Sequence, residues 1–101
     1  MDALRELAGR FDAAAESLTA ASGRLMSLEP SPDTLAAGAP GRLGELGRVL
    51  HGQWVGAIGA RAREAAATGA RIADAAGTLR AVAADYAGVD EAARQRQPEV
   101  P

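Results

Sequence analysis

The sequence predicts an all-α protein, an antiparallel hairpin of two long helices with a possible short helix or kink between them. Three observations predict this fold. Two long stretches carry apolar residues at alternating intervals of three and four. Prolines at positions 30, 32 and 40 separate the two stretches. The first stretch is rich in Leu and the second in Ala and Gly, so bulky side chains of one helix can settle against small ones of the other.

The first helix is expected over about residues 2–28. Its apolar positions follow the a/d spacing of a coiled-coil seam. They are Leu4, Leu7, Phe11, Ala14, Leu18, Ala21, Leu25 and Leu28. The helix must end there, because Pro30 and Pro32 cannot supply helical N–H groups.

A connector is expected over residues 29–41. Within it, Ser31 is placed to cap one helical turn that has Pro32 at its first position. Gly38 is expected to close this turn, because glycine adopts the left-handed conformation at little cost. The sequence therefore allows a short helix between the two long ones, and a kink without helix is the open alternative.

The second helix is expected over about residues 42–95. Its seam is predicted to consist of Leu43, Leu46, Leu50, Trp54, Ile58, Ala62, Ala65, Gly69, Ile72, Ala76, Leu79, Ala83 and Tyr86. From Leu46 to Ala62 every interval is four residues, which interrupts the heptad count. Three glycines fall in the same region, and each costs roughly 1 kcal/mol relative to alanine in a helix interior. A break over residues 52–59 is therefore an open alternative to a continuous helix.

The two helices are expected to form one domain over residues 1–96, followed by a disordered tail at 97–101. At 1.5 Å per residue the first helix reaches only about 38 Å, whereas the second would reach about 80 Å. The longer helix would leave apolar side chains uncovered, and an isolated hairpin buries little surface. We therefore expect the chain to pair with itself or with a homologous helical hairpin, forming a four-helix assembly.

Composition argues against most other classes of function. The net charge of -2 does not favour nucleic acid as a partner, and no stretch is long and apolar enough for stable insertion into a membrane. The chain has no cysteine and a single histidine, His51, so neither a metal site nor a catalytic site is expected. The protein is predicted to be a non-enzymatic binding protein with no cofactor.

Two short motifs stand out in a chain with one Trp, one Tyr and one Phe. Trp54 and Gly56 form a Trp-x-Gly element. Tyr86 and Asp90 are four residues apart near the end of the second helix, so they share a face and could present a phenol and a carboxylate to a receptor.

With these motifs, the chain resembles the EspC-like and WXG-type small secreted substrates of type VII (ESX) secretion systems. The resemblance spans nearly the whole chain and is most specific over residues 79–94. It implies export as a folded helical dimer without a cleavable signal peptide, from a cytoplasmic pool. It also implies that Tyr86 and Asp90 form the export signal read by the secretion ATPase, and that Trp54 with Gly56 is the Trp-x-Gly element.

One feature departs from the WXG-type pattern. In those proteins the Trp-x-Gly motif lies at the hairpin turn, whereas the prolines here predict the turn well before Trp54. Either residues 52–59 form a second bend, or the Trp-x-Gly element is coincidental. The alternative function is that of an intracellular structural coiled-coil adaptor, which would use the same seams and have no export role.

Overall fold

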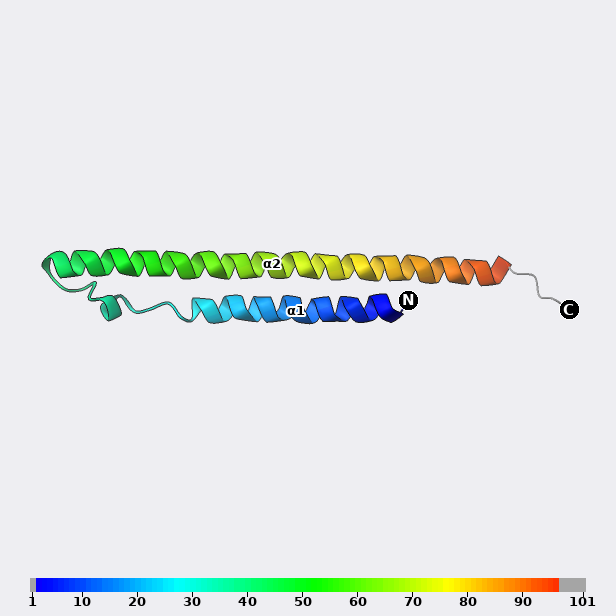
Figure 1. Cartoon of the computed structure of the whole chain (residues 1–101), viewed down its shortest axis with the longest axis horizontal. Helices are drawn as coiled ribbons and strands as arrows, with labels where there is room; N and C mark the ends of the chain where they lie inside the picture. The colour runs from blue at the N-terminus through cyan, green and yellow to red at the C-terminus, as the bar shows by residue number, and fades with distance from the viewer. Residues whose placement is uncertain (1, 97–101) are drawn as a thin grey trace. The chain divides into compact units, whose positions relative to one another are not determined.

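The computed structural model describes residues 2–96 and contains three helical elements. They are α1 (Asp2–Met26), the short 3-10 helix η1 (Pro32–Leu35) and α2 (Gly41–Arg96). Residues 2–96 contain no strand, and α1 and α2 pack as a hairpin (Figure 1). The prediction of an all-α helical hairpin is confirmed. The predicted disordered tail, 97–101, lies outside the described residues.

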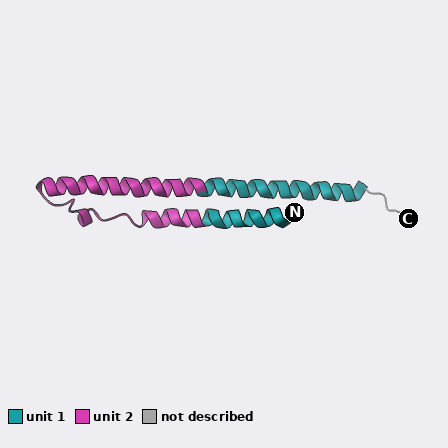
Figure 2. Ribbon diagram, in the orientation of Figure 1, with its two compact units in different colours: residues 1–16, 69–101 teal, residues 17–68 magenta. Residues whose placement is uncertain are grey.

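The chain divides into two compact units, where the sequence favours one domain over 1–96 (Figure 2). Unit 1 joins the N-terminal part of α1, up to residue 16, with α2 from residue 69 onward. Unit 2 consists of residues 17–68 and therefore holds the rest of α1, the connector and the first half of α2. Each unit is thus a pairing of one segment of α1 with one segment of α2.

The end of α1 is fixed by backbone and side-chain hydrogen bonds. The Ser27 amide donates to the Gly23 carbonyl over 3.2 Å, and the Leu28 amide donates to the Leu25 carbonyl over 3.1 Å. The Ser27 hydroxyl donates to the Arg24 carbonyl over 2.7 Å. These bonds satisfy carbonyl groups that the end of a helix would leave without partners. The chain then turns at Pro30.

The packing face of α1 differs from the predicted seam. The buried and half-buried residues that repeat along the helix are Leu4, Ala8, Phe11, Ala15, Leu18, Ser22 and Leu25, called here the α1 row. The large residues of this row recur every seven positions, as predicted, but small residues alternate with them. Leu7 is 39% exposed and Leu28 is 63% exposed, so both lie outside the row. Small side chains take the second position because they let the two backbones approach closely.

The packing face of α2 begins one residue later than predicted. It consists of Gly44, Gly47, His51, Val55, Ile58, Ala62, Ala65, Gly69, Ile72, Ala76, Leu79 and Ala83, called here the α2 row. From Ile58 to Ala83 the row coincides with the predicted seam, but the predicted seam residue Tyr86 lies outside the row and is 53% exposed. Before Ile58 the predicted residues Leu43, Leu46, Leu50 and Trp54 each precede a row residue, and all four are exposed. Since successive helical residues are about 100° apart, these four side chains point away from the packing face.

The α2 helix is uninterrupted through residues 52–59. The predicted seam suggests a break because its intervals are four residues long from Leu46 to Ala62. The α2 row is more regular, since it contains only one pair of successive four-residue intervals, from Gly47 to Val55. The glycines of this segment lie within the helix, and a Cβ built at Gly52 or Gly56 would meet nothing within 4 Å. Of the two alternatives that the sequence leaves open, the structure contains the continuous helix.

Two glycines determine which face of α2 packs at the start of the helix, because the connector lies directly against them. A Cβ at Gly44 would come within 3.0 Å of the Ala39 carbonyl group. A Cβ at Gly47 would lie 2.8 Å from the Ala36 carbonyl carbon and 2.9 Å from the Ala37 nitrogen. Real Cβ atoms do not approach other atoms so closely. Only glycine therefore allows the backbone of residues 35–39 to pack on this face of α2.

Of the two possibilities for the connector, the structure contains the short helix, but this helix ends at a different residue than expected. Ser31 precedes η1 in an extended conformation, with no side-chain cap. The left-handed residue that ends η1 is Ala36, at φ 59°, where the sequence favours Gly38. The Ala36 amide donates to the Asp33 carbonyl and the Ala37 amide to the Pro32 carbonyl. These bonds offset part of the cost of a left-handed alanine.

Two side chains of α2 also form hydrogen bonds with the segment between the two long helices. Arg48 Nη1 donates to the Ala37 carbonyl over 2.9 Å, and His51 Nε2 lies 2.9 Å from the Pro30 carbonyl. Because a carbonyl only accepts, His51 must carry its proton on Nε2 to make this bond. The single histidine of the chain thus has a structural role in unit 2.

The core is made of small residues. In the part of the chain that the structure describes, the buried apolar side chains are all alanines: Ala8, Ala15, Ala62, Ala76 and Ala83. The larger apolar residues of both rows are only half-buried. The solvent-accessible surface is 7325 Å² for a chain of 10.2 kDa, whereas a typical folded monomer of this mass exposes about 5,300 Å². The fold therefore exposes more surface than a typical monomer of this mass, and large apolar side chains such as Leu28, Leu43 and Val89 are among the exposed residues.

The contact between Gly47 and the connector gives a stability prediction. Gly47→Ala is expected to destabilise the protein by about 1–3 kcal/mol, because the added methyl group forces the connector away from α2. This loss should exceed the gain of roughly 1 kcal/mol that alanine brings to a helix interior. Thermal and urea unfolding followed by circular dichroism would measure it.

The matched control is Gly52→Ala, where the methyl group enters open space. This variant is expected to be more stable than the wild type by up to about 1 kcal/mol. Equal effects of the two substitutions would contradict the packing of the connector on Gly47.

Candidate docking surfaces

The predicted motif at the end of α2 is accessible. Ala83 is fully buried, whereas Tyr86, three residues later, is 53% exposed. Asp90 is exposed as well. Four residues apart on a continuous helix, Tyr86 and Asp90 lie on the same face. The structure therefore presents a phenol and a carboxylate together, as the sequence predicts from their spacing. This pair is called here the C-terminal handle.

Exposed valines flank the handle. Val82 is 37% exposed and Val89 is 61% exposed, and both are close to Tyr86 in helical angle. On the next turn, Arg94 Nη1 lies 3.6 Å from a Glu91 carboxylate oxygen. The handle thus belongs to an apolar strip that ends in a carboxylate, which suits a receptor groove with an apolar floor and a basic rim.

An ion pair of unit 1 shows which sides of α1 and α2 belong together. Asp12 and Arg80 pair across the two helices, and each directly follows a row residue, Phe11 or Leu79. The residues that follow row positions therefore lie on one side of the helix pair. Residues that precede row positions lie on the other side, which places exposed Leu7 on the same side as Val82.

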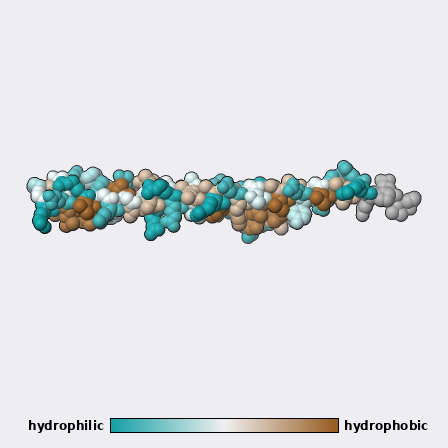
Figure 3. Space-filling view, turned by 90° about the horizontal axis from the view of Figure 1, so that it is seen from above, coloured by the Kyte–Doolittle hydropathy of each residue, from teal (hydrophilic) through white to brown (hydrophobic). Residues whose placement is uncertain are grey.

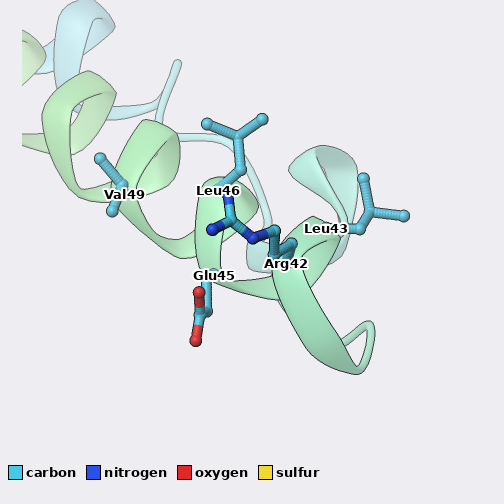
Figure 4. A pocket seen from close by; sticks show the side chains of 5 residues that line it. All are labelled: Arg42, Leu43, Glu45, Leu46 and Val49. Carbon is cyan, nitrogen blue, oxygen red and sulfur yellow. The ribbon is translucent and has the colours of Figure 1, made fainter.

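The other exposed apolar surface belongs to unit 2. It is formed by Leu43, Leu46, Leu50 and Trp54, which are 62%, 57%, 42% and 49% exposed and are called here the α2 stripe. Leu43 and Leu46 line an open hollow with Arg42, Glu45 and Val49. Figure 4 shows these two leucines projecting outward from the first turns of α2, with Glu45 pointing away from Leu46. In Figure 3, hydrophobic atoms gather where α2 begins.

The Trp-x-Gly element lies in the middle of a straight run of helix. Trp54 and Gly56 are both within α2, and the turn of the hairpin is made by the connector between α1 and α2. Trp54 is the last member of the α2 stripe, and Gly56 is exposed. The element is therefore neither at the turn nor at a second bend.

The remaining predicted seam residues fall into two groups. Those in the rows are half-buried: Leu4, Phe11, Leu18, Leu25, Ile58, Ile72 and Leu79. Those outside the rows are exposed: Leu7, Leu28, Leu43, Leu46 and Leu50. The structure thus separates one predicted seam into a packing face within the hairpin and an apolar surface beside it.

Sequence reasoning also misses a contact inside unit 2. The Ser22 hydroxyl donates to the Ala62 carbonyl over 2.8 Å, which joins the two rows by a part-buried hydrogen bond. The signal for it is the seven-residue spacing of Ala8, Ala15 and Ser22, which places Ser22 on the packing face once Ala8 is assigned there.

No group of three or more histidine, cysteine, aspartate or glutamate side chains among residues 2–96 is arranged to hold a metal ion. Within the same residues, no helix has both the length and the apolar character needed to span a bilayer.

The chain matches no protein-family model, and no curated protein or solved structure is significantly similar to it.

The exposure of the handle gives a second stability prediction. Tyr86→Ala is expected to change the free energy of unfolding by no more than about 0.5 kcal/mol, because Tyr86 is more than half exposed and lies outside the α2 row. Ala83→Leu, three residues earlier, should cost about 1–3 kcal/mol, because a larger side chain cannot fit between the helices. Urea unfolding of the two variants would test this contrast, and a large loss with Tyr86→Ala would show that the tyrosine belongs to the core.

Proposed function

We propose that this protein is a non-enzymatic substrate or partner of a type VII (ESX) secretion system, exported as a folded helical dimer. In this proposal Tyr86 and Asp90 form the export signal, and the secretion ATPase of the machinery reads it. The protein would reach the outside of the cell without a cleavable signal peptide, from a cytoplasmic pool.

One observation carries the proposal. The C-terminal handle lies on a continuous helix beyond Ala83, the last buried residue of the α2 row, with both side chains exposed on one face. A receptor can therefore bind the phenol and the carboxylate without unfolding the hairpin. The resemblance of residues 79–94 to type VII substrates gives this accessible pair its interpretation as a signal.

The proposal does not depend on the Trp-x-Gly element. Trp54 lies within α2 and away from the connector, unlike the motif of WXG-type proteins at the hairpin turn. We therefore assign the export signal to the handle alone and treat Trp54 as part of the α2 stripe.

The alternative function, an intracellular coiled-coil adaptor, would use the same helical surfaces. It differs in one respect, since an adaptor needs no signal at Tyr86. The half-buried large residues and uncovered apolar surface of the hairpin fit both functions, because both involve docking to another helical protein. Only a measurement of export separates them.

Export from a host with an ESX system tests the proposal. Tyr86→Ala and Asp90→Ala are expected to reduce the amount of protein in the culture filtrate at least about tenfold, with unchanged amounts in the cell pellet. Both should retain wild-type helicity, because both side chains are exposed. Immunoblots of filtrate and pellet would measure the distribution.

The matched control is Val89→Ala, which removes an exposed apolar side chain from the same turns of α2. Its export should remain close to that of the wild type. Unchanged export of Tyr86→Ala, or retention of the wild-type protein in the cell, would instead favour the adaptor.

A further inference from the structure

We propose that the α2 stripe is the contact between two copies of this chain, which pair antiparallel about a two-fold axis near Arg48 and Val49. This inference rests on the dimer of the proposed function and deepens it by naming the partner, the residues and the register. It does not depend on the export signal.

The spacing of the stripe fits a second copy of itself. When a second α2 runs in the opposite direction, Leu46 can meet the second copy's Leu50, and Leu43 can meet its Trp54. The midpoint of the first pairing is residue 48, and that of the second falls between residues 48 and 49. A single two-fold axis thus satisfies both pairings, which is the requirement for a self-complementary interface.

The charges around the stripe also permit this pairing. At about 100° per residue, the four stripe residues fall within an arc of about 80°, and Gly52 lies on the opposite side of the helix. Glu45 points away from Leu46 (Figure 4). Arg48 is turned toward the connector, where it donates to the Ala37 carbonyl. The remaining charged residue near the stripe is Arg42, and the antiparallel register brings it toward Gln53 and Trp54 of the second copy. No like charges meet, and a guanidinium beside an indole is favourable.

The surface of the chain leaves room for such an interface. The accessible area exceeds that expected for a monomer of this mass by about 2,000 Å², whereas a standard interface covers only about 800 Å² per partner. Within unit 2 the stripe gathers large exposed apolar side chains, and an aromatic residue is among them. Burial of leucine and tryptophan against the same residues of a second copy would remove this surface from water.

Sedimentation of the full chain tests the interface. The wild type is expected to be a dimer at micromolar concentration, and Leu50→Glu should shift it to a monomer by placing two carboxylates near the axis. The control Gly52→Glu adds the same charge on the opposite side of the helix, where its Cβ meets nothing within 4 Å, and should remain a dimer. Circular dichroism would verify that all three proteins are equally helical.

The outcomes separate this inference from the proposed function. If the wild type is a dimer and the Leu50→Glu variant remains one, the inference is overturned, and the two copies pair through another surface. A helical wild-type monomer at micromolar concentration would overturn both the inference and the dimer of the proposed function. Neither result would alter the export test on Tyr86.

Disulfide cross-linking tests the register, even if Leu50→Glu were to unfold. The chain has no cysteine, so introduced thiols are the only ones present. A mixture of Leu46→Cys and Leu50→Cys chains, one of them tagged, should form a mixed disulfide on mild oxidation. Cα atoms paired across the interface would lie within the roughly 4.4–6.8 Å that a disulfide spans.

The matched control is a mixture of Glu45→Cys and Gly52→Cys chains. The midpoint of residues 45 and 52 also falls between residues 48 and 49, close to the proposed axis. Their side chains face away from the axis, so no enrichment of mixed disulfide is expected. Equal cross-linking in both mixtures would overturn the proposal, as would cross-links of Leu46→Cys chains only with each other.

Discussion

Close approach of backbones at small residues is the constraint on which this structure depends. In unit 2 the connector lies against Gly44 and Gly47, where a Cβ atom would collide with it. In unit 1 the fully buried positions are Ala8, Ala76 and Ala83. Since the helices meet through residues with little or no side chain, their larger neighbours are pushed to the edges of the contact. The exposed apolar surfaces of the protein are a consequence of this arrangement.

The same constraint relates stability to function. A hairpin whose buried apolar side chains are alanines gains less from burial than one with a leucine core, because stabilisation grows with the apolar area removed from water. The side chains that would have formed such a core remain at the surface, in the α2 stripe and around the C-terminal handle. They are thereby available to other proteins, and a folded hairpin of this kind is suited to docking.

The two surfaces differ in chemistry, which suggests different partners. The α2 stripe is almost purely apolar, and its antiparallel pairings, Leu46 with Leu50 and Leu43 with Trp54, have midpoints within half a residue of each other, so it fits a second copy of itself. The handle combines a phenol, a carboxylate and neighbouring valines, and this asymmetric set suits a receptor of different structure. The α2 stripe belongs to unit 2, and the handle belongs to unit 1.

Most of the fold follows from the sequence alone. The interval of three and four residues determined that both long segments are amphipathic helices, and the prolines determined where the chain turns, because these effects act locally. The spacing of Tyr86 and Asp90 likewise fixed their common face, once the helix was assigned. The handle could therefore be predicted without knowledge of any contact.

The tertiary structure alone decided which face of each helix packs. The size of their side chains favours Leu43, Leu46, Leu50 and Trp54 as the seam. The sequence gives little reason to choose the neighbouring Gly44 and Gly47 instead. The choice depends on how closely the connector approaches α2, and this approach is a tertiary contact that helical periodicity does not determine. The tertiary structure also decided that the helix continues through Gly52 and Gly56. The α2 row has more regular intervals than the predicted seam, whose irregular spacing suggests a break. A shift of one residue along a helix rotates the packing face by about 100°, and only the packed structure determines that rotation.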